Sequence, residues 1–190
     1  MDLPYIQAQH FEKIHFTENP LQVAEYEDCK FLQCDWSSAD LSNFRFINCE
    51  FVQCNWSNAK IRKTVIDNVK FKECKLWGLH FNDCEPFALS FYFDKCSLNY
   101  TTFFKTVIKK TTFCNCQLHE VDFSVCNLSQ AVFENCDLHK AIFDQTVLDK
   151  ADFTTAYHFS INPNQNSIKK AKFSLEGLKG LLDSYDIIVK

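Results

Sequence analysis

Cysteines are the residues of this chain most suited to chemistry, because thiolates bind metals and exchange disulfides. There are 11 of them, and the Cys29/Cys34 and Cys49/Cys54 pairs have a spacing that suggests metal ligands. Ten of them, however, stand two positions before a recurring slot for a large side chain. A compact buried residue suits that position, and free cysteine provides one without any metal. The ten are Cys29, Cys34, Cys49, Cys54, Cys74, Cys84, Cys96, Cys116, Cys126 and Cys136.

The remaining candidates for chemistry are few. Cys114 follows a large apolar residue, so we expect it to face outward and to be the most reactive thiol. His119 and His139 are twenty residues apart with Asp137 close to the second, but exposed ligands without supporting contacts bind metal weakly. The 3 glycines are isolated, and neither a His-Glu-x-x-His run nor a nucleophile elbow is present. We therefore predict a protein that is not an enzyme and holds no cofactor or metal.

The recurring slot belongs to a five-residue repeat that is clearest from Thr111 to Phe153. Its third position alternates between Phe and Leu, beginning with Phe113 and Leu118, and its first position is small or β-branched. A period of five fits neither a helix at 3.6 residues nor a flat strand at 2. The first and third residues of an extended unit point to the same side. Each unit therefore predicts a very short strand followed by a bend, and a chain of such units winds into a solenoid.

The repeat extends upstream in a second frame, with large apolar residues every five positions from Phe11 to Phe81. The two frames are out of phase, because Phe81 and Phe93 are twelve residues apart, which is two repeats plus two residues. The extra pair is expected near Glu85-Pro86-Phe87, since proline lacks the N–H that a ladder needs. We predict a bulge or small loop there that joins two stacked halves.

The units Ala131-Val132-Phe133 and Cys136-Asp137-Leu138 resemble those of the pentapeptide-repeat family. The resemblance implies an all-β fold, a right-handed quadrilateral β-helix with about twenty residues per coil. We expect an N-terminal cap at 1–20, the repeat helix at 21–158 and a C-terminal segment at 159–190. A short helical turn is expected after Pro20 in the cap, because proline suits the first helical position.

The C-terminal segment is expected to form an α-helix capped by Ser174 and then a strand over Ile187–Val189. Its apolar residues have two possible roles. They plug the open end of the β-helix, or they form a two-fold interface with a second copy. Their number favours the dimer. They are Leu175, Leu178, Leu181, Leu182, Tyr185, Ile187, Ile188 and Val189.

Charge is mild overall, at −4, but it is unevenly distributed along the chain. Residues 60–75 hold six bases against two acids, a basic belt between more acidic ends. Outward acids make the C-terminal half negative and are the predicted partner-binding face. They are Asp122, Glu134, Asp137, Asp144, Asp149 and Asp152. The sequence shows neither a secretory signal nor a stretch long enough to span a membrane, so we expect a cytoplasmic protein with free thiols.

The whole layout resembles the Qnr-type quinolone-resistance and microcin-immunity branch of the family. The shared features are two repeat blocks, an interruption near Pro86 and an apolar tail through Gly180-Leu181-Leu182. That resemblance implies a DNA-mimicking homodimer that binds and protects DNA gyrase or topoisomerase IV, without binding nucleic acid itself. The alternative is a structural or adaptor rod with an unrelated cytoplasmic protein partner.

Overall fold

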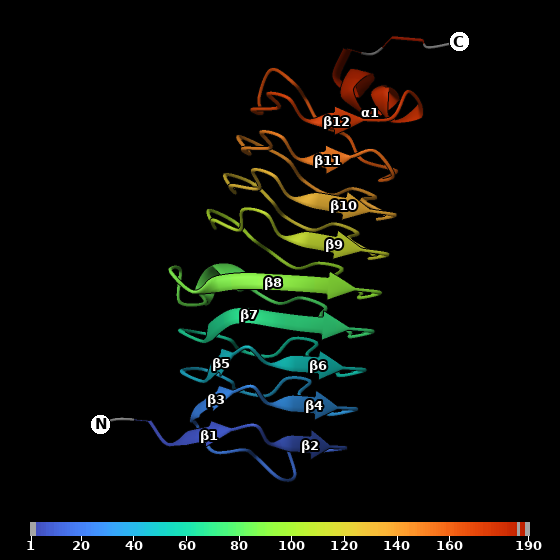
Figure 1. The fold of residues 1–190 in the computed structure, drawn as a ribbon. Coiled ribbons are helices and arrows are strands. Elements are labelled where there is room, and N and C mark those ends of the chain that lie inside the picture. Colours follow the sequence, from blue (N-terminus) through green and yellow to red (C-terminus); the bar gives the residue numbers. More distant parts are fainter. Residues whose placement is uncertain (1–2, 186, 189–190) are drawn as a thin grey trace.

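The computed structural model, which describes residues 3–185 and 187–188, is a parallel β-helix whose coils stack from the N-terminus to the C-terminus (Figure 1). The chain crosses the near side from left to right while it climbs, so the helix is right-handed (Figure 1). The strands are β1 (Tyr5–Gln7), β2 (His10–Glu12), β3 (Glu25–Glu27), β4 (Lys30–Leu32), β5 (Arg45–Ile47), β6 (Glu50–Val52), β7 (Val65–Lys72), β8 (Leu89–Asp94), β9 (Thr112–Cys114), β10 (Val132–Glu134), β11 (Asp152–Phe153) and β12 (Lys172–Phe173). Short helices follow at η1 (Phe81–Asp83), η2 (Glu176–Leu178), α1 (Lys179–Leu182) and η3 (Asp183–Tyr185).

Each coil has four sides, and residues one coil apart pair in parallel. Thus Phe11 pairs with Phe31, and Phe113 with Phe133. We number the sides as walls 1 to 4 by the columns of paired residues that face outward. Wall 1 holds β2, β4, β6 and β9–β12, and wall 4 holds β1, β3, β5, Val107, Asn127 and Val147. The longer strands β7 and β8 begin on wall 4 and continue onto wall 1. Wall 2 holds Asp35, Asn55, Lys75, Ser97, Gln117 and Asp137, and wall 3 holds Asp40, Lys60, His80, Thr102, Asp122 and Ile142. The bends predicted from the repeat and the four-sided helix implied by the family resemblance are both confirmed.

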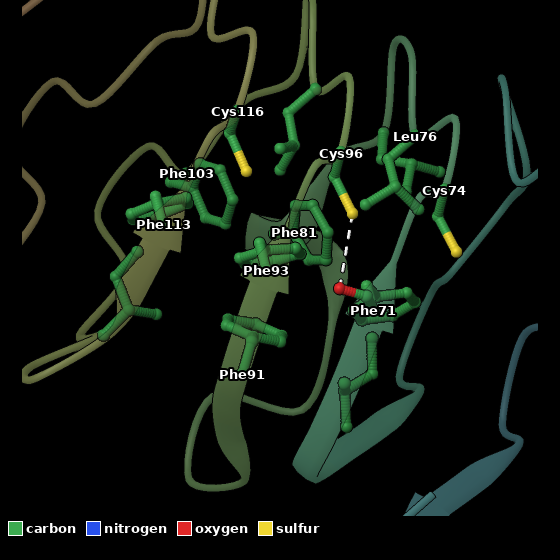
Figure 2. Close-up of a cluster of buried hydrophobic side chains, with 14 of the residues drawn as sticks. Phe71, Cys74, Leu76, Phe81, Phe91, Phe93, Cys96, Phe103, Phe113 and Cys116 are labelled. Atoms are coloured by element: carbon green, nitrogen blue, oxygen red, sulfur yellow. Dashed lines mark hydrogen bonds between the residues drawn. The ribbon is translucent and has the colours of Figure 1, made fainter. Parts of the chain in front are cut away.

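The core is a set of vertical stacks of the large repeat residues. Behind wall 1 the stack is all phenylalanine and runs the length of the rod, with neighbouring ring centroids 4.6–5.4 Å apart. Its members are Phe11, Phe31, Phe51, Phe71, Phe93, Phe113, Phe133, Phe153 and Phe173. Cysteines line the same interior, and the Cys96 thiol donates to the carbonyl oxygen of Phe71 at 3.4 Å (Figure 2). Offset stacking and burial together hold each coil to the next.

The bends between walls are made by residues in the left-handed region of backbone conformation. From Lys13 to Lys150 a positive φ recurs two residues after the large repeat residue at nearly every corner. Glycine occupies only one of these corners, Gly78, where a Cβ would meet the Asn58 side-chain oxygen at 2.5 Å. Lysine, glutamine and asparagine fill most of the other corners. One corner holds a β-branched residue, Val125, at φ 58°. Each non-glycine corner costs conformational energy that the stacking on either side must outweigh.

The coil insertion lies where the sequence predicts it, but it does not divide the core. Paired residues are 20 apart at Asn55–Lys75, 23 apart at Ile66–Leu89 and 22 apart from Val69–Phe91 onward. The extra residues therefore lie before β8, and a bulge in β7 between Ile66 and Val69 leaves a net insertion of two. The phenylalanine stack continues across it, with Phe71 and Phe93 5.4 Å apart and 11° from parallel. The interruption is therefore a bulge on one wall, and the repeat blocks on its two sides share one continuous core, because the other three columns stay in register.

The two ends differ from the predictions in detail. Segment 1–20 supplies β1 and β2, and a hydrogen-bonded turn from His15 to Asn19 precedes Pro20, where we expected a helical turn to follow it. The α-helix α1 is present, but Ile187 and Ile188 are not in a strand, because no further coil is there to pair with them. Val189 lies outside the described residues. No helix in the described chain is long and apolar enough to cross a membrane.

Candidate binding surface

The C-terminal segment first closes the end of the β-helix, with α1 packed on the last coil (Figure 1). The Ser174 hydroxyl accepts a hydrogen bond from the Gly177 N–H at 3.0 Å, so the serine predicted to cap the α-helix supports the 3-10 turn η2, and α1 begins only at Lys179. Gly180 accepts from the Ile161 N–H at 2.8 Å, and a Cβ there would lie 2.2 Å from the Phe159 carbonyl oxygen. Only glycine permits this approach, so the segment is fitted to the end of the rod.

Most of the apolar residues predicted in this segment surround one hollow. It measures about 500 Å³ and is lined by Pro163, Leu178, Leu181, Leu182, Tyr185 and Ile187. Leu181 also packs against the core, whereas Leu178 is 41% exposed. Leu175 and Ile188 extend into solvent, at 82% and 87% exposure. One part of the segment therefore plugs the helix, while the rest leaves an apolar surface uncovered.

The six acids predicted to form a face are not brought together on one side of the rod. Val132 on wall 1 pairs with Asp152, and Glu134 ends the same wall. Asp137 belongs to wall 2 and Asp122 to wall 3. Asp144 follows the wall 3 residue Phe143, and Asp149 follows the wall 4 residue Leu148. The acids therefore surround the C-terminal half as a negative sleeve.

Several of these carboxylates are engaged in local structure. Asp122 accepts from the Ser124 N–H at 2.8 Å, and Asp149 accepts from the Ser167 hydroxyl at 2.7 Å. Asp152 is bound by the Lys172 ammonium at 3.0 Å. Burial favours a higher pKa for Asp152, but hydrogen bonds from Thr154 and Lys172 hold that pKa below its usual value. These carboxylates stabilise local structure, so part of their negative charge is already paired with groups of the same chain.

Asp137 is the centre of a histidine cluster on wall 2. Its two oxygens lie 2.9 Å from His119 Nε2 and 2.9 Å from His158 Nδ1, and the His139 ring lies between those two rings. Burial acts to raise the pKa of Asp137, but the two histidine hydrogen bonds lower it overall. Within the described residues, no group of three or more His, Cys, Asp or Glu is arranged to hold a metal ion.

The cysteines follow the predicted division between buried and accessible. The ten repeat cysteines are buried and free, and Cys114 is half-exposed. Burial raises the pKa of Cys49 and of Cys126 to about 12, so neither is a thiolate at neutral pH. Cys114 is reachable, but partial burial and the nearby Glu134 carboxylate raise its pKa as well. Its accessibility agrees with the prediction of a reactive thiol, whereas its raised pKa opposes it.

The basic belt at 60–75 is spread over three walls of the rod. Lys60 and Arg62 lie on wall 3, Lys70 and Lys72 on wall 1, and Lys75 on wall 2. Several of these cations already have partners, since Lys72 forms an ion pair with Glu50 at 2.6 Å and Lys75 lies 3.9 Å above the Trp77 ring. Because residues 60–75 pass from one wall to the next, their positive charges do not gather on a single basic face.

Two family models match the chain: "Pentapeptide repeat region" over residues 24–103 and "Pentapeptide repeats (8 copies)" over residues 116–154. The chain belongs to the pentapeptide-repeat family. Among solved structures, full-length QnrB1, described as a plasmid-mediated fluoroquinolone resistance protein, matches with a TM-score of 0.58 and 18% identity, over 96% of this chain and 100% of that one. HetL, a cyanobacterial pentapeptide repeat protein from Nostoc involved in heterocyst differentiation regulation, matches with a TM-score of 0.44 and 13% identity, over 93% and 89%. No curated protein matches by sequence.

One exposed surface was not anticipated from the sequence. At the coil insertion, Phe87 is 96% exposed beside Phe104 and Val107, which are 37% and 56% exposed. The signal was available, because Phe87 falls outside both repeat frames and so has no inward slot. We call the apolar surface made by Pro86, Phe87, Leu89, Phe104 and Val107 the coil-insertion patch.

Proposed function

We propose that the protein is a non-enzymatic protein-binding rod that acts as a homodimer joined at its C-terminal ends. The observation that carries the proposal is the uncovered apolar hollow beside α1, flanked by the exposed Leu175 and Ile188. A plug for the β-helix needs one apolar face, and Leu181 already provides it. The outward apolar side chains gain free energy only when another surface covers them. A second copy related by a two-fold axis presents the matching surface.

The dimer is tested by sedimentation velocity on the purified chain across a range of concentrations. Leu178→Asp puts a charge into the hollow without removing Leu181 from the core, so we expect the mass of one chain where the unaltered protein has the mass of two. Val23→Asp is the matched control, because Val23 is 39% exposed and lies just before β3, at the opposite end of the rod from the C-terminal hollow. A monomeric unaltered protein, or a Leu178→Asp dimer of unchanged affinity, contradicts the proposal.

For the partner, we propose a type II topoisomerase, with the negative sleeve occupying a surface that otherwise holds DNA phosphates. Support comes from the ring of acids near the presumed dimer centre and from a fold shared over the full length with a fluoroquinolone-resistance protein. Acids on all four walls suit a partner that surrounds the rod better than one that touches a single side. The alternative is an adaptor rod whose cytoplasmic partner is unrelated to topoisomerases.

A gyrase supercoiling assay with and without a fluoroquinolone separates these partners. We expect the protein to change supercoiling or to restore it in the presence of the drug. Glu134→Lys with Asp144→Lys should weaken that effect, because these two acids are not tied into a backbone turn as Asp122 and Asp149 are. No effect at stoichiometric excess rejects the topoisomerase and leaves the adaptor.

A further inference from the structure

The coil-insertion patch is a fixed part of the rod, because both ends of the extra segment are tied to the coil below. The Glu85 N–H donates to the Thr64 carbonyl at 3.0 Å, and the Ile66 N–H donates to the Ala88 carbonyl at 3.2 Å. Between these bonds the Ala88 N–H reaches back to the Glu85 carbonyl at 3.3 Å, which closes a turn. Phe87 is presented at the tip of this turn, so its exposure is built into the backbone.

The patch surrounds a second hollow, of about 460 Å³. Its lining is mainly apolar and combines the turn with the next coil, where Phe104 ends wall 3 and Val107 begins wall 4. Most phenylalanines of the repeat occupy inward slots, and Phe87 is more exposed than the other outward aromatic residues, of which Tyr100 is 57% and Trp77 37% exposed. A contiguous group of exposed apolar side chains, unlike a single one, marks an interaction site on a monomer surface.

The charged residue in the lining is a lysine that is free to bind an anion. Lys105 places its ammonium 4.9 Å from the centre of the Phe104 ring. It forms no ion pair with any residue of the described chain, and neither do Lys109 and Lys110, which follow on the next corner. Neither Asp83 nor Glu85, the acids nearest to the turn in sequence, lines the hollow. The hollow therefore has an apolar floor and one cationic rim.

From this arrangement we propose that the patch binds a peptide segment of a partner protein. The segment offers one large apolar side chain to the hollow and a carboxylate to Lys105. Apolar anchors seated in a pocket and ringed by charge are the usual energetic centre of protein interfaces. The inference rests on the proposed role as a protein-binding rod, but it does not depend on the dimer or on a topoisomerase partner.

The apolar floor of the hollow and its cationic rim argue against two other ligands, nucleic acid and a second copy of the chain. Nucleic acid is held by many cations that follow its phosphates, and here the cations stand on one edge of an apolar surface. A second copy of this chain would have to offer an apolar anchor with a carboxylate beside it. The turn itself presents Phe87 two residues after Glu85, so self-association is an outcome that the experiment must distinguish.

The test is selection from a random twelve-residue peptide library displayed on phage, with the full-length protein immobilised. We expect enriched peptides that combine an aromatic or large aliphatic residue with Asp or Glu. A synthetic copy of the most enriched peptide should lose at least about tenfold in affinity against Phe87→Ser and against Lys105→Glu. Ile142→Ser is the matched control, because it removes an exposed apolar side chain two coils away and should leave binding unchanged.

Four results overturn the proposal. Two concern the selection: no enrichment over the Phe87→Ser protein, or enriched peptides that are neutral or basic. The other two are peptide affinity that is unchanged by Lys105→Glu, and a change in sedimentation on Phe87→Ser, which would show that the patch joins two copies of the chain. Circular dichroism confirms that each variant is folded, and Phe87 is solvent-exposed, so its loss leaves the core intact. A negative result in the dimer test does not contradict this proposal, because that test measures association through the C-terminal hollow.

Discussion

The continuous phenylalanine stack predicts that its middle members stabilise the rod more than its end members. Phe133 is fully buried, with its ring centroid 5.0 Å from that of Phe113 and 4.6 Å from that of Phe153. We expect Phe133→Ala to lower the free energy of unfolding by about 4 kcal/mol, because it removes a core ring and both stacking contacts. Phe173→Ala, at a half-buried position with one stacked neighbour at 5.3 Å, should cost about 2 kcal/mol.

Urea unfolding followed by two probes tests both the magnitude and its location. All three tryptophans, Trp36, Trp56 and Trp77, lie in the N-terminal half, so their fluorescence reports that half, while far-UV circular dichroism reports the whole rod. In a solenoid, stability is approximately a sum of unit and nearest-neighbour terms. Phe133→Ala should therefore unfold the C-terminal coils first. The dichroism transition then precedes the fluorescence transition, whereas in the unaltered protein the two coincide.

The reasoning fails if Phe133→Ala costs less than about 1.5 kcal/mol, or if it costs no more than Phe173→Ala. Coincident transitions in the variant would instead show that the rod unfolds as one unit and that coupling between coils exceeds the local loss. Phe133→Leu is the matched control, because leucine fills the equivalent slot behind wall 2, as at Leu138. It retains an apolar side chain while removing both stacks, and we expect a loss of about 1.5 kcal/mol.

Two smaller predictions concern charge and thiol chemistry. The carboxylate form of Asp137 is favoured in the folded state, so its stabilising effect is present above the ordinary Asp pKa of about 3.9 and is lost as pH falls through the lower folded value. Asp137→Asn should therefore cost about 1 kcal/mol at neutral pH and nothing in strong acid, as measured by urea titration at both pH values. Ellman's reagent should modify one thiol per folded chain, slowly at neutral pH because burial and Glu134 raise the Cys114 pKa, and Cys114→Ser should abolish the reaction.

The sequence is sufficient for the core of this fold because each large side chain marks its own place. The period of five sets the bends, and the alternation of Phe113, Leu118, Phe123 and Leu128 assigns a residue type to each wall. The inward place of the cysteines follows from their distance to those residues. The family resemblance added the number of sides and the handedness, which a period alone does not determine.

The corners were harder to predict, because the residues there do not show the usual sign of a left-handed backbone. Such a conformation ordinarily favours glycine or asparagine, yet Lys63, Glu73 and Gln145 adopt it here. The stacking of adjacent coils imposes the bend, so tertiary contacts decide the conformation instead of local preference. The missing C-terminal strand has a related cause, since Ile187 has strand-forming character but no neighbouring coil.

The distribution of surface charges has a geometric cause that also explains where the apolar surfaces lie. A coil turns through all four walls, so a run of charges longer than one five-residue unit is spread over several walls, and a column on one wall is built from residues one full coil apart. The acids from Asp122 to Asp152 and the bases from Lys60 to Lys75 are distributed in this way. Residues close in sequence gather on one surface only where the winding is interrupted or ends. Those two places are the turn at Phe87 and the segment around Leu178, where the apolar hollows lie.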